Sequence, residues 1–208
     1  MFQYAWRIAQ GSVKVTLYSR LRPPYSGIVW HPGRSIIGKL CQQEHSCQPV
    51  FNSFEFVSQN VEQTEQLGRT LGQHLTGGDV ICLSGDLGTG KTALTRGIGA
   101  GWNAHEPITS PTFTLVHEHH RARDNQILYH IDCYRLASAS DAWSIGLEDL
   151  LYGHDPVVLE WAENVQDWLP PERLWITLAF LDSTRRHIHL TAAGERYRAL
   201  LAALQAMS

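Results

Sequence analysis

A glycine-rich segment that ends in lysine and threonine carries the clearest chemical signal in the sequence. It consists of Gly85, Asp86, Leu87, Gly88, Thr89, Gly90, Lys91 and Thr92. The spacing G-x-x-x-x-G-K-S/T is typical of a loop that binds nucleotide phosphates, because its glycines let backbone N–H groups approach the phosphate oxygens. We expect Lys91 to reach the β- and γ-phosphates and the Thr92 hydroxyl to hold Mg²⁺.

Two acidic residues stand where a magnesium site would need them. A phosphate loop of this kind requires a carboxylate at the end of a neighbouring strand, since Mg²⁺ prefers hard oxygen ligands. Glu160 follows the apolar run Val157–Leu159, and Asp132 follows the strand-like run Ile127–Ile131. Both acids would lie at the C-terminal edge of an open sheet, where ligands bind in such folds. We therefore expect both to overlook the phosphate loop.

Three further features could serve the same site. Thr112 lies in a Ser-Pro-Thr segment that is either a loop sensing Mg²⁺ or the γ-phosphate, or a polar turn held by proline. Trp161 follows Glu160 directly and would either stack on or seal the nucleotide site, or pack in the core. Arg135 and the pair Arg185 and Arg186 could contact phosphate, base or a partner, although most surface arginines are merely solvated.

Four histidines raise the alternative of a zinc site. They are His117, His119, His120 and His130. The chain has neither an HExxH motif nor a matched set of cysteines, which are the usual sequence signatures of zinc binding. We interpret these histidines as half-exposed residues of a hairpin.

The sequence favours ATP but leaves the reaction open. Residues 164–167, Asn-Val-Gln-Asp, lack the lysine of a guanine-specificity motif, so ATP is favoured over GTP. The leading hypothesis is an ATPase, and the alternative is a small-molecule kinase of the P-loop class. A kinase usually has a lid with several arginines, whereas the segment after the phosphate-loop helix is short and has no arginine cluster. A third possibility is a nucleotide-dependent binding module whose hydrolysis is incidental.

Apolar periodicity predicts the elements that position these residues. The expected strands are 54–57, 79–84, 113–118, 126–132, 156–160, 174–180 and 187–190, and the expected helices are 61–75, 92 to about 102, 141–151 and 193–207. Runs 113–118 and 126–132 are expected to form a hairpin. The order of the elements predicts an α/β fold of the P-loop NTPase type, with three layers and a mixed, mainly parallel sheet between helices.

The first 53 residues differ from the rest of the chain. They alternate aromatic, proline and basic residues without a sustained period, and they carry six Lys/Arg against one acid. We expect an N-terminal extension, 1–53, that is poorly ordered or translated from a misassigned start. An arginine-rich, acid-poor targeting arm is the alternative. The P-loop domain would then cover residues 54–208.

Charge and cysteine content indicate the compartment and the class of partner. With a total charge of −3 and +5 on the extension, the domain carries −8, so RNA contact is expected to run through partners rather than directly. The cysteines Cys41, Cys47, Cys82 and Cys133 show no C-x-x-C spacing, which favours reduced thiols. No stretch reaches the roughly 18 apolar residues of a membrane span. We expect a cytoplasmic protein with no membrane partner.

Residues 54–208 resemble the TsaE family, the P-loop ATPase subunit of bacterial tRNA threonylcarbamoyladenosine biosynthesis. Beside the phosphate loop, four sequence blocks match in order. They are Ser-Pro-Thr-Phe-Thr-Leu-Val at 110–116, His-Ile-Asp-Cys-Tyr-Arg-Leu at 130–136, Gly-Leu-Glu-Asp at 146–149 and Glu-Trp-Ala-Glu at 160–163. Two features depart from the family pattern: Ala162 replaces the usual proline, and the extension 1–53 is foreign to it.

The resemblance implies a function and a set of site residues. It implies an ATPase that docks onto a TsaB–TsaD heterodimer and cycles it during threonylcarbamoylation of the adenosine beside the anticodon of ANN-reading tRNAs. ATP and Mg²⁺ would be its cofactors. Carried over by position, Lys91 and Thr92 bind phosphate and Mg²⁺, Glu160 is a magnesium carboxylate, Asp132 and Thr112 act near the γ-phosphate, Trp161 belongs to a Glu-Trp pair, and Asn60 to Thr64 lie near the adenine.

Overall fold

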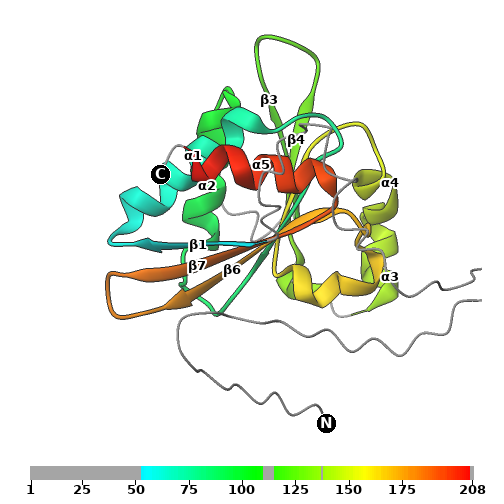
Figure 1. Ribbon diagram of the computed structural model, residues 1–208. Helices are drawn as coiled ribbons and strands as arrows, with labels where there is room; N and C mark the ends of the chain where they lie inside the picture. Colours follow the sequence, from blue (N-terminus) through cyan, green and yellow to red (C-terminus); the bar gives the residue numbers. More distant parts are fainter. Residues whose placement is uncertain (1–52, 110–114, 137, 207–208) are drawn as a thin grey trace, which may run out of the picture. The chain divides into compact units, whose positions relative to one another are not determined.

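The computed structural model describes residues 53–109, 115–136 and 138–206, which belong to one unit of the chain, Cys47–Ser208 (Figure 1). The expected extension 1–53 lies outside the described residues except for Ser53, so its boundary stays a prediction. The Ser-Pro-Thr segment with Thr112 also lies outside them.

A seven-stranded sheet forms the middle of the described domain. The strands are β1 (Ser53–Ser58), β2 (Val80–Ser84), β3 (Val116–His120), β4 (Ile127–Asp132), β5 (Val157–Glu160), β6 (Arg173–Phe180) and β7 (Arg186–Ala193). Their order is β1-β7-β6-β2-β5-β4-β3. The pairings β6–β2, β2–β5 and β5–β4 are parallel, and the outer pairings are antiparallel. Because β1 and β6 both run opposite to β7, only β7 and β3 oppose the common direction. The predicted mixed, mainly parallel sheet and the β3–β4 hairpin are confirmed.

The alternation of side chains along β2 explains why this strand lies in the middle of the sheet. Every residue of β2 is buried. Ile81 and Leu83 belong to the hydrophobic core on one face of the sheet, whereas Val80 and Cys82 belong to the core on the other. A strand that is apolar on both faces has to be covered by helices on both sides, and the fold therefore has three layers.

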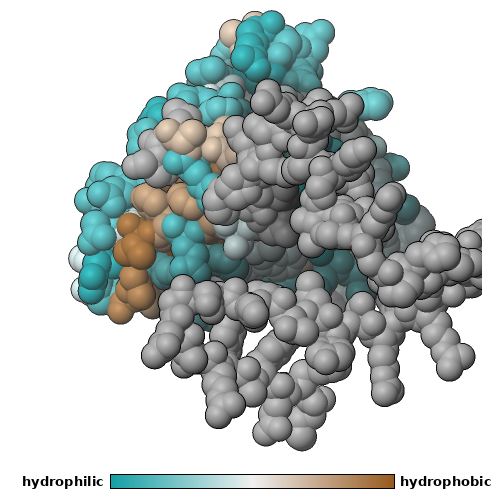
Figure 2. All heavy atoms as spheres, viewed as in Figure 1, coloured by the Kyte–Doolittle hydropathy of each residue, from teal (hydrophilic) through white to brown (hydrophobic). Residues whose placement is uncertain are grey.

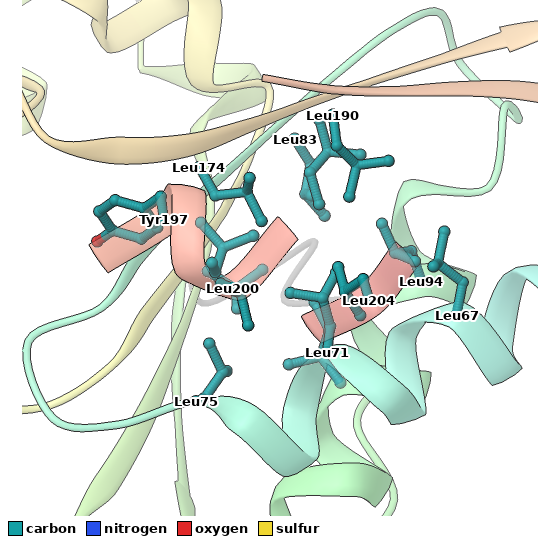
Figure 3. Close-up of a cluster of buried hydrophobic side chains, with 14 of the residues drawn as sticks. Leu67, Leu71, Leu75, Leu83, Leu94, Leu174, Leu190, Tyr197, Leu200 and Leu204 are labelled. Carbon is teal, nitrogen blue, oxygen red and sulfur yellow. The ribbon is translucent and has the colours of Figure 1, made fainter. Parts of the chain in front are cut away.

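One face of the sheet is covered by α1 (Val61–His74), α2 (Lys91–Trp102) and α5 (Glu195–Gln205). Leucines of all three helices converge there on apolar residues of the sheet (Figure 3). The labelled members are Leu67, Leu71, Leu75, Leu83, Leu94, Leu174, Leu190, Tyr197, Leu200 and Leu204. This core fixes α2, and with it the start of that helix, against the C-terminal ends of the central strands.

Glycines let α1 and α2 approach more closely than side chains would permit. A Cβ atom on Gly68 or Gly72 would collide with the backbone carbonyls of Leu94 or Ile98, and one on Gly97 would collide with the backbone of α1. Two of the glycines that lower the helical propensity of α2, Gly97 and Gly101, are thus positions where its backbone contacts α1. The helix ends at Trp102, as predicted.

The other face of the sheet carries short helices, and here one prediction is wrong. The sequence predicted a single helix over 141–151, whereas the structure has α3 (Ala139–Ser144) and α4 (Leu147–Leu151). Gly146 lies between them with φ 65°, in the left-handed region, which ends one helix and begins the next. The 3-10 segments η2 (Cys133–Arg135) and η3 (Ala162–Trp168) complete this layer.

Exposed apolar side chains gather at one edge of the domain. Val57 near the end of β1, Val61 at the start of α1, Phe180 at the end of β6 and Leu181 in the turn after it are each 41–49% exposed. Figure 2 shows a small hydrophobic patch among mostly hydrophilic residues at this side of the molecule. None of the described helices is long and apolar enough to cross a membrane.

Candidate functional site

The glycine-rich loop connects β2 to α2, the strand–loop–helix context that the motif requires. Three of its glycines have positive φ: Gly85 at 131°, Gly88 at 80° and Gly90 at 104°. At Gly85 a Cβ atom would also collide with the carbonyl oxygen of Leu178 on β6. The hydroxyl of Thr89 donates to the carbonyl of Asp86 at 2.8 Å and closes the loop on itself. The sequence thus curls the backbone around the N-terminus of α2, where anions bind readily.

Lys91 is folded into this loop. Its side-chain Nζ donates to the carbonyl oxygens of Gly85 at 2.6 Å and Asp86 at 2.9 Å, and the residue is only 4% exposed. Nζ also lies 3.6 Å from the centre of the Trp161 ring. Burial lowers the pKa of Lys91, while nearby acids, Glu160 first among them, oppose that shift. The ammonium group of Lys91 is therefore held at the loop, where it could donate to a phosphate oxygen in place of a loop carbonyl.

Glu160 ends β5 directly beside the start of α2. The carboxylate is nearly completely buried, at 3% exposure. Its Oε2 accepts a hydrogen bond from the Thr92 hydroxyl at 2.9 Å, and its Oε1 accepts one from His130 Nε2 at 2.9 Å. The Thr95 hydroxyl makes a longer contact with Oε1, at 3.4 Å. The two predicted metal-binding residues, Thr92 and Glu160, are therefore brought together by elements 68 residues apart in the chain.

The donor set suits Mg²⁺. No cluster of three or more His, Cys, Asp or Glu able to hold a metal occurs among residues 53–109, 115–136 and 138–206. A hydroxyl beside one carboxylate instead matches an ion that keeps several waters and binds substrate phosphates. For the zinc alternative the hairpin histidines offer no such cluster, and the interpretation of His130 as half-exposed is wrong because that residue is completely buried.

Asp132 lies beside Glu160 but has another contact in this structure. The register of β4 and β5 pairs the two residues directly, so both are at the C-terminal edge of the sheet. The Asp132 carboxylate accepts a hydrogen bond from the backbone N–H of Tyr134 at 2.9 Å and thereby caps η2. The Tyr134 ring in turn contacts Trp161, with ring centres 4.9 Å apart.

Trp161 has an unusual backbone. Its φ of 58° and ψ of 41° place a bulky residue in the left-handed region, which costs energy and often marks a functional turn. This turn places the ring over Lys91, and the ring also packs against the hydrophobic core on that face of the sheet. The two roles that the sequence left open are thus both compatible with its position, and a role in nucleotide binding stays a prediction.

A cleft of about 340 Å³ adjoins the phosphate loop. It contains the two residues predicted near an adenine, Asn60 and Thr64, but Arg185 is not among its lining residues. Arg185 pairs instead with Asp182 at 2.6 Å. Sequence reasoning missed two residues of the β6–β7 turn that line the cleft, Ser183 and Thr184, because this turn and α1 meet only in the folded domain. Glu62 and Arg186 also line it, and they fall in the expected segment 60–64 and the expected arginine pair 185–186.

The strand order, the glycine loop between β2 and α2, and the carboxylate at the end of the adjacent strand together define a P-loop NTPase-like fold. A solved structure agrees: the crystal structure of Bacillus subtilis YdiB matches with a TM-score of 0.61 and 32% identity, covering 74% of this chain and 95% of that one.

The chain belongs to the TsaE family. The family model described as threonylcarbamoyl adenosine biosynthesis protein TsaE matches residues 58–188. Among curated relatives, the tRNA threonylcarbamoyladenosine biosynthesis protein TsaE of Bacillus subtilis is 36% identical over 142 residues, which are 68% of this chain and 87% of that protein. The protein of the same name from Treponema pallidum is 39% identical over 132 residues, 64% of this chain and 96% of that protein. The expected family is thus confirmed.

Proposed function

We propose that this protein is the ATP-hydrolysing subunit of a cytoplasmic system that makes threonylcarbamoyladenosine in tRNA. The observation that carries the proposal is the meeting of Lys91, Thr92 and Glu160 at the C-terminal edge of the central strands. Family membership supplies the tRNA modification, and the geometry of the loop supports the nucleotide chemistry.

Each residue of the site has a defined task in this proposal. Lys91 exchanges its contacts with the loop carbonyls for phosphate oxygens and neutralises their charge. Thr92 offers its hydroxyl to Mg²⁺, and Glu160 orients that hydroxyl and the waters around the ion. Asp132 lies where it can orient an attacking water after releasing its contact with η2. MgATP would supply the γ-phosphoryl group that is transferred to water.

The cleft beside the loop is the proposed site of the adenosine. Asn60 lies at the start of α1, where its side chain accepts from the backbone N–H of Gln63 at 2.9 Å. Thr64 donates to Ser58 at 2.8 Å, and this buried hydrogen bond fixes the wall of the cleft. On the opposite side Arg186 stacks on Phe180, 4.4 Å from the ring centre. A cleft of about 340 Å³ that is lined by several polar side chains suits a nucleoside.

We propose a TsaB–TsaD-type heterodimer as the partner, with tRNA contacted only through the assembled complex. The net charge of −8 on residues 54–208 supports this indirect route, because acidic surfaces repel the tRNA backbone. Hydrolysis would cycle the complex between rounds of modification, and turnover by the isolated chain would be slow.

The test is ATP hydrolysis by the purified chain, alone and with a TsaB–TsaD pair, using Lys91→Met as the blank. Slow turnover that rises at least about tenfold with the pair and is absent from the blank supports a partner-dependent ATPase. Turnover that ignores the pair but phosphorylates a small hydroxylated metabolite would instead establish the kinase alternative.

A further inference from the structure

His130 is a completely buried histidine in the middle of β4. Its Nε2 lies 2.9 Å from Oε1 of Glu160, and the nucleotide chemistry proposed above gives this histidine no role. A carboxylate oxygen only accepts, so Nε2 carries the proton in this contact. The histidine therefore donates a hydrogen bond to the carboxylate that also contacts the phosphate-loop threonine.

The sheet register places His130 on the same face as this carboxylate. His130 pairs with Val158 and Asp132 pairs with Glu160 across β4 and β5. Because side chains alternate along a strand, all four point to one face, and Val158 packs in the core beneath α1 and α2. Glu160 consequently lies between the hydroxyls of α2 and the His130 ring.

The two oxygens of Glu160 have separate partners. Oε2 accepts from the Thr92 hydroxyl at 2.9 Å, and Oε1 accepts from His130 at the same distance. Among the described residues, the 3.4 Å contact with Thr95 is all that Oε1 would keep without His130, and that is a weak hydrogen bond. Rotation about the terminal torsion of a glutamate is intrinsically soft. The histidine therefore supplies the contact that fixes the carboxylate plane.

The ring has no competing hydrogen bond within the described part of the chain. Its Nδ1 has no partner there, and its other neighbour is His119, stacked with ring centres 6.4 Å apart. A structural histidine would be expected to satisfy both nitrogens with nearby backbone or side-chain groups. The hydrogen bonding of His130 is instead committed to Glu160.

We propose that His130 is a positioning residue that orients Glu160 for Mg²⁺ and the nucleotide phosphates. The inference rests on the proposed function, since it assumes that Glu160 serves a magnesium–nucleotide complex. It adds a residue that acts through Glu160 and does not itself touch the ion. Partners that orient a metal-binding group in this way typically change metal affinity or activity about 10- to 100-fold when they are removed.

The test compares His130→Gln with His130→Met. The glutamine amide N–H₂ can occupy the place of ring Nε2–H, whereas methionine fills the cavity without donating. Binding of ADP is measured by titration calorimetry over a range of Mg²⁺ concentrations and in EDTA. We expect both variants to bind metal-free ADP within about threefold of the parent, and only His130→Met to lose the Mg²⁺-dependent gain, by about 10- to 100-fold.

His119→Gln is the matched control, because His119 stacks on the same ring while its Nε2 has no hydrogen-bond partner in the part of the chain that the structure describes. It should keep the full Mg²⁺-dependent gain. If His130→Met does not fold, as judged by its thermal melt, His130→Asn replaces it, since the shorter amide cannot reach Glu160. A Mg²⁺-dependent gain in ADP binding that is kept by the glutamine variant and lost by the asparagine variant would then support the positioning role in the same way.

The possible failures are distinguishable. If the parent protein shows Mg²⁺-dependent ADP binding and the methionine or asparagine variant retains it, the positioning role of His130 is refuted while the proposed function stands. Equal loss in the glutamine and methionine variants would also refute that role, because packing rather than donation would be responsible. A parent protein without any Mg²⁺-dependent binding would overturn the proposed function itself.

Discussion

Replacing the phosphate-loop lysine should weaken nucleotide binding strongly and leave the stability of the fold nearly unchanged. Lys91 is the only lysine after residue 39, and it is buried against two loop carbonyls and the face of Trp161. Lys91→Met keeps the length and apolar stem of the side chain but removes its charge. The variant therefore leaves the hydrophobic contacts of the loop in place and takes away its cation.

The magnitude follows from what the lysine exchanges on binding. A hydrogen bond to a charged group contributes about 1.5–3 kcal/mol, and with ADP the lysine would exchange its contacts with two neutral carbonyls for contacts with the negatively charged β-phosphate. We take the net gain of this exchange as one such hydrogen bond. Because about 1.4 kcal/mol corresponds to a factor of ten in the dissociation constant, loss of the lysine should lower ADP affinity by about 10- to 150-fold.

The expected effect on folding is small and has a different origin. Burial lowers the pKa of Lys91, so the fold disfavours the charged form of this side chain. Methionine removes that penalty but also removes two hydrogen bonds to carbonyls, and the two effects oppose each other. We expect the free energy of unfolding to change by less than about 1 kcal/mol.

Calorimetric titration with ADP and urea unfolding of the same samples would test both expectations. The control is Arg96→Met, which removes a cation from the same helix, where Arg96 forms an exposed ion pair with Glu65 at 2.9 Å. That pair should contribute at most about 1 kcal/mol, and ADP binding should be unchanged. Affinity of Lys91→Met within threefold of the parent would refute the assignment of the phosphate site.

Two further predictions concern packing and pH. Gly72→Ala should lower the free energy of unfolding, measured in urea, by about 1–3 kcal/mol, because the added Cβ would collide with the Ile98 carbonyl. The control, Gln73→Ala at an exposed position of the same helix, should change the free energy little. Equal effects of the two substitutions would contradict the close contact between the helices. Burial, with neighbouring histidines, lowers the pKa of His119 from 6.5 to about 4. As the pH falls from 6.5 to about 4, this histidine is therefore protonated in the unfolded chain before it is protonated in the folded one. Stability should fall over this pH range, by at most about 1.4 kcal/mol per pH unit. His119→Gln should flatten this part of the pH–stability curve, and an unchanged slope would show that another group is responsible.

The sequence by itself determined the strand–loop–helix unit and the family. The pattern at residues 85–92 is local, since its glycines, lysine and threonine act through backbone conformation and the start of one helix. Short β-branched runs likewise identified every strand of the described sheet to within a few residues. Such signals are readable because they depend on neighbours in the chain.

One local expectation was wrong because a single residue changed the backbone. The apolar pattern continued across Gly146 and indicated one helix, but the left-handed φ of that glycine divided it in two. The arginine pair 185–186 was expected to contact phosphate, base or a partner, and the turn gives its members different surroundings: Arg185 pairs with Asp182, whereas Arg186 lines the cleft. Adjacent side chains in a turn can face opposite ways, and the periodicity of the sequence does not predict which of the two faces inward.

Only the tertiary structure decided how the site is assembled. Glu160 meets Thr92 and His130 because β5 lies between β2 and β4, a strand order that joins segments about 30 to 70 residues apart. The left-handed turn at Trp161, which directs its ring over Lys91, has no marker in the sequence. These contacts depend on strand register and on the packing of α2 against the sheet, which are fixed by non-local burial rather than by the residues adjacent in the chain.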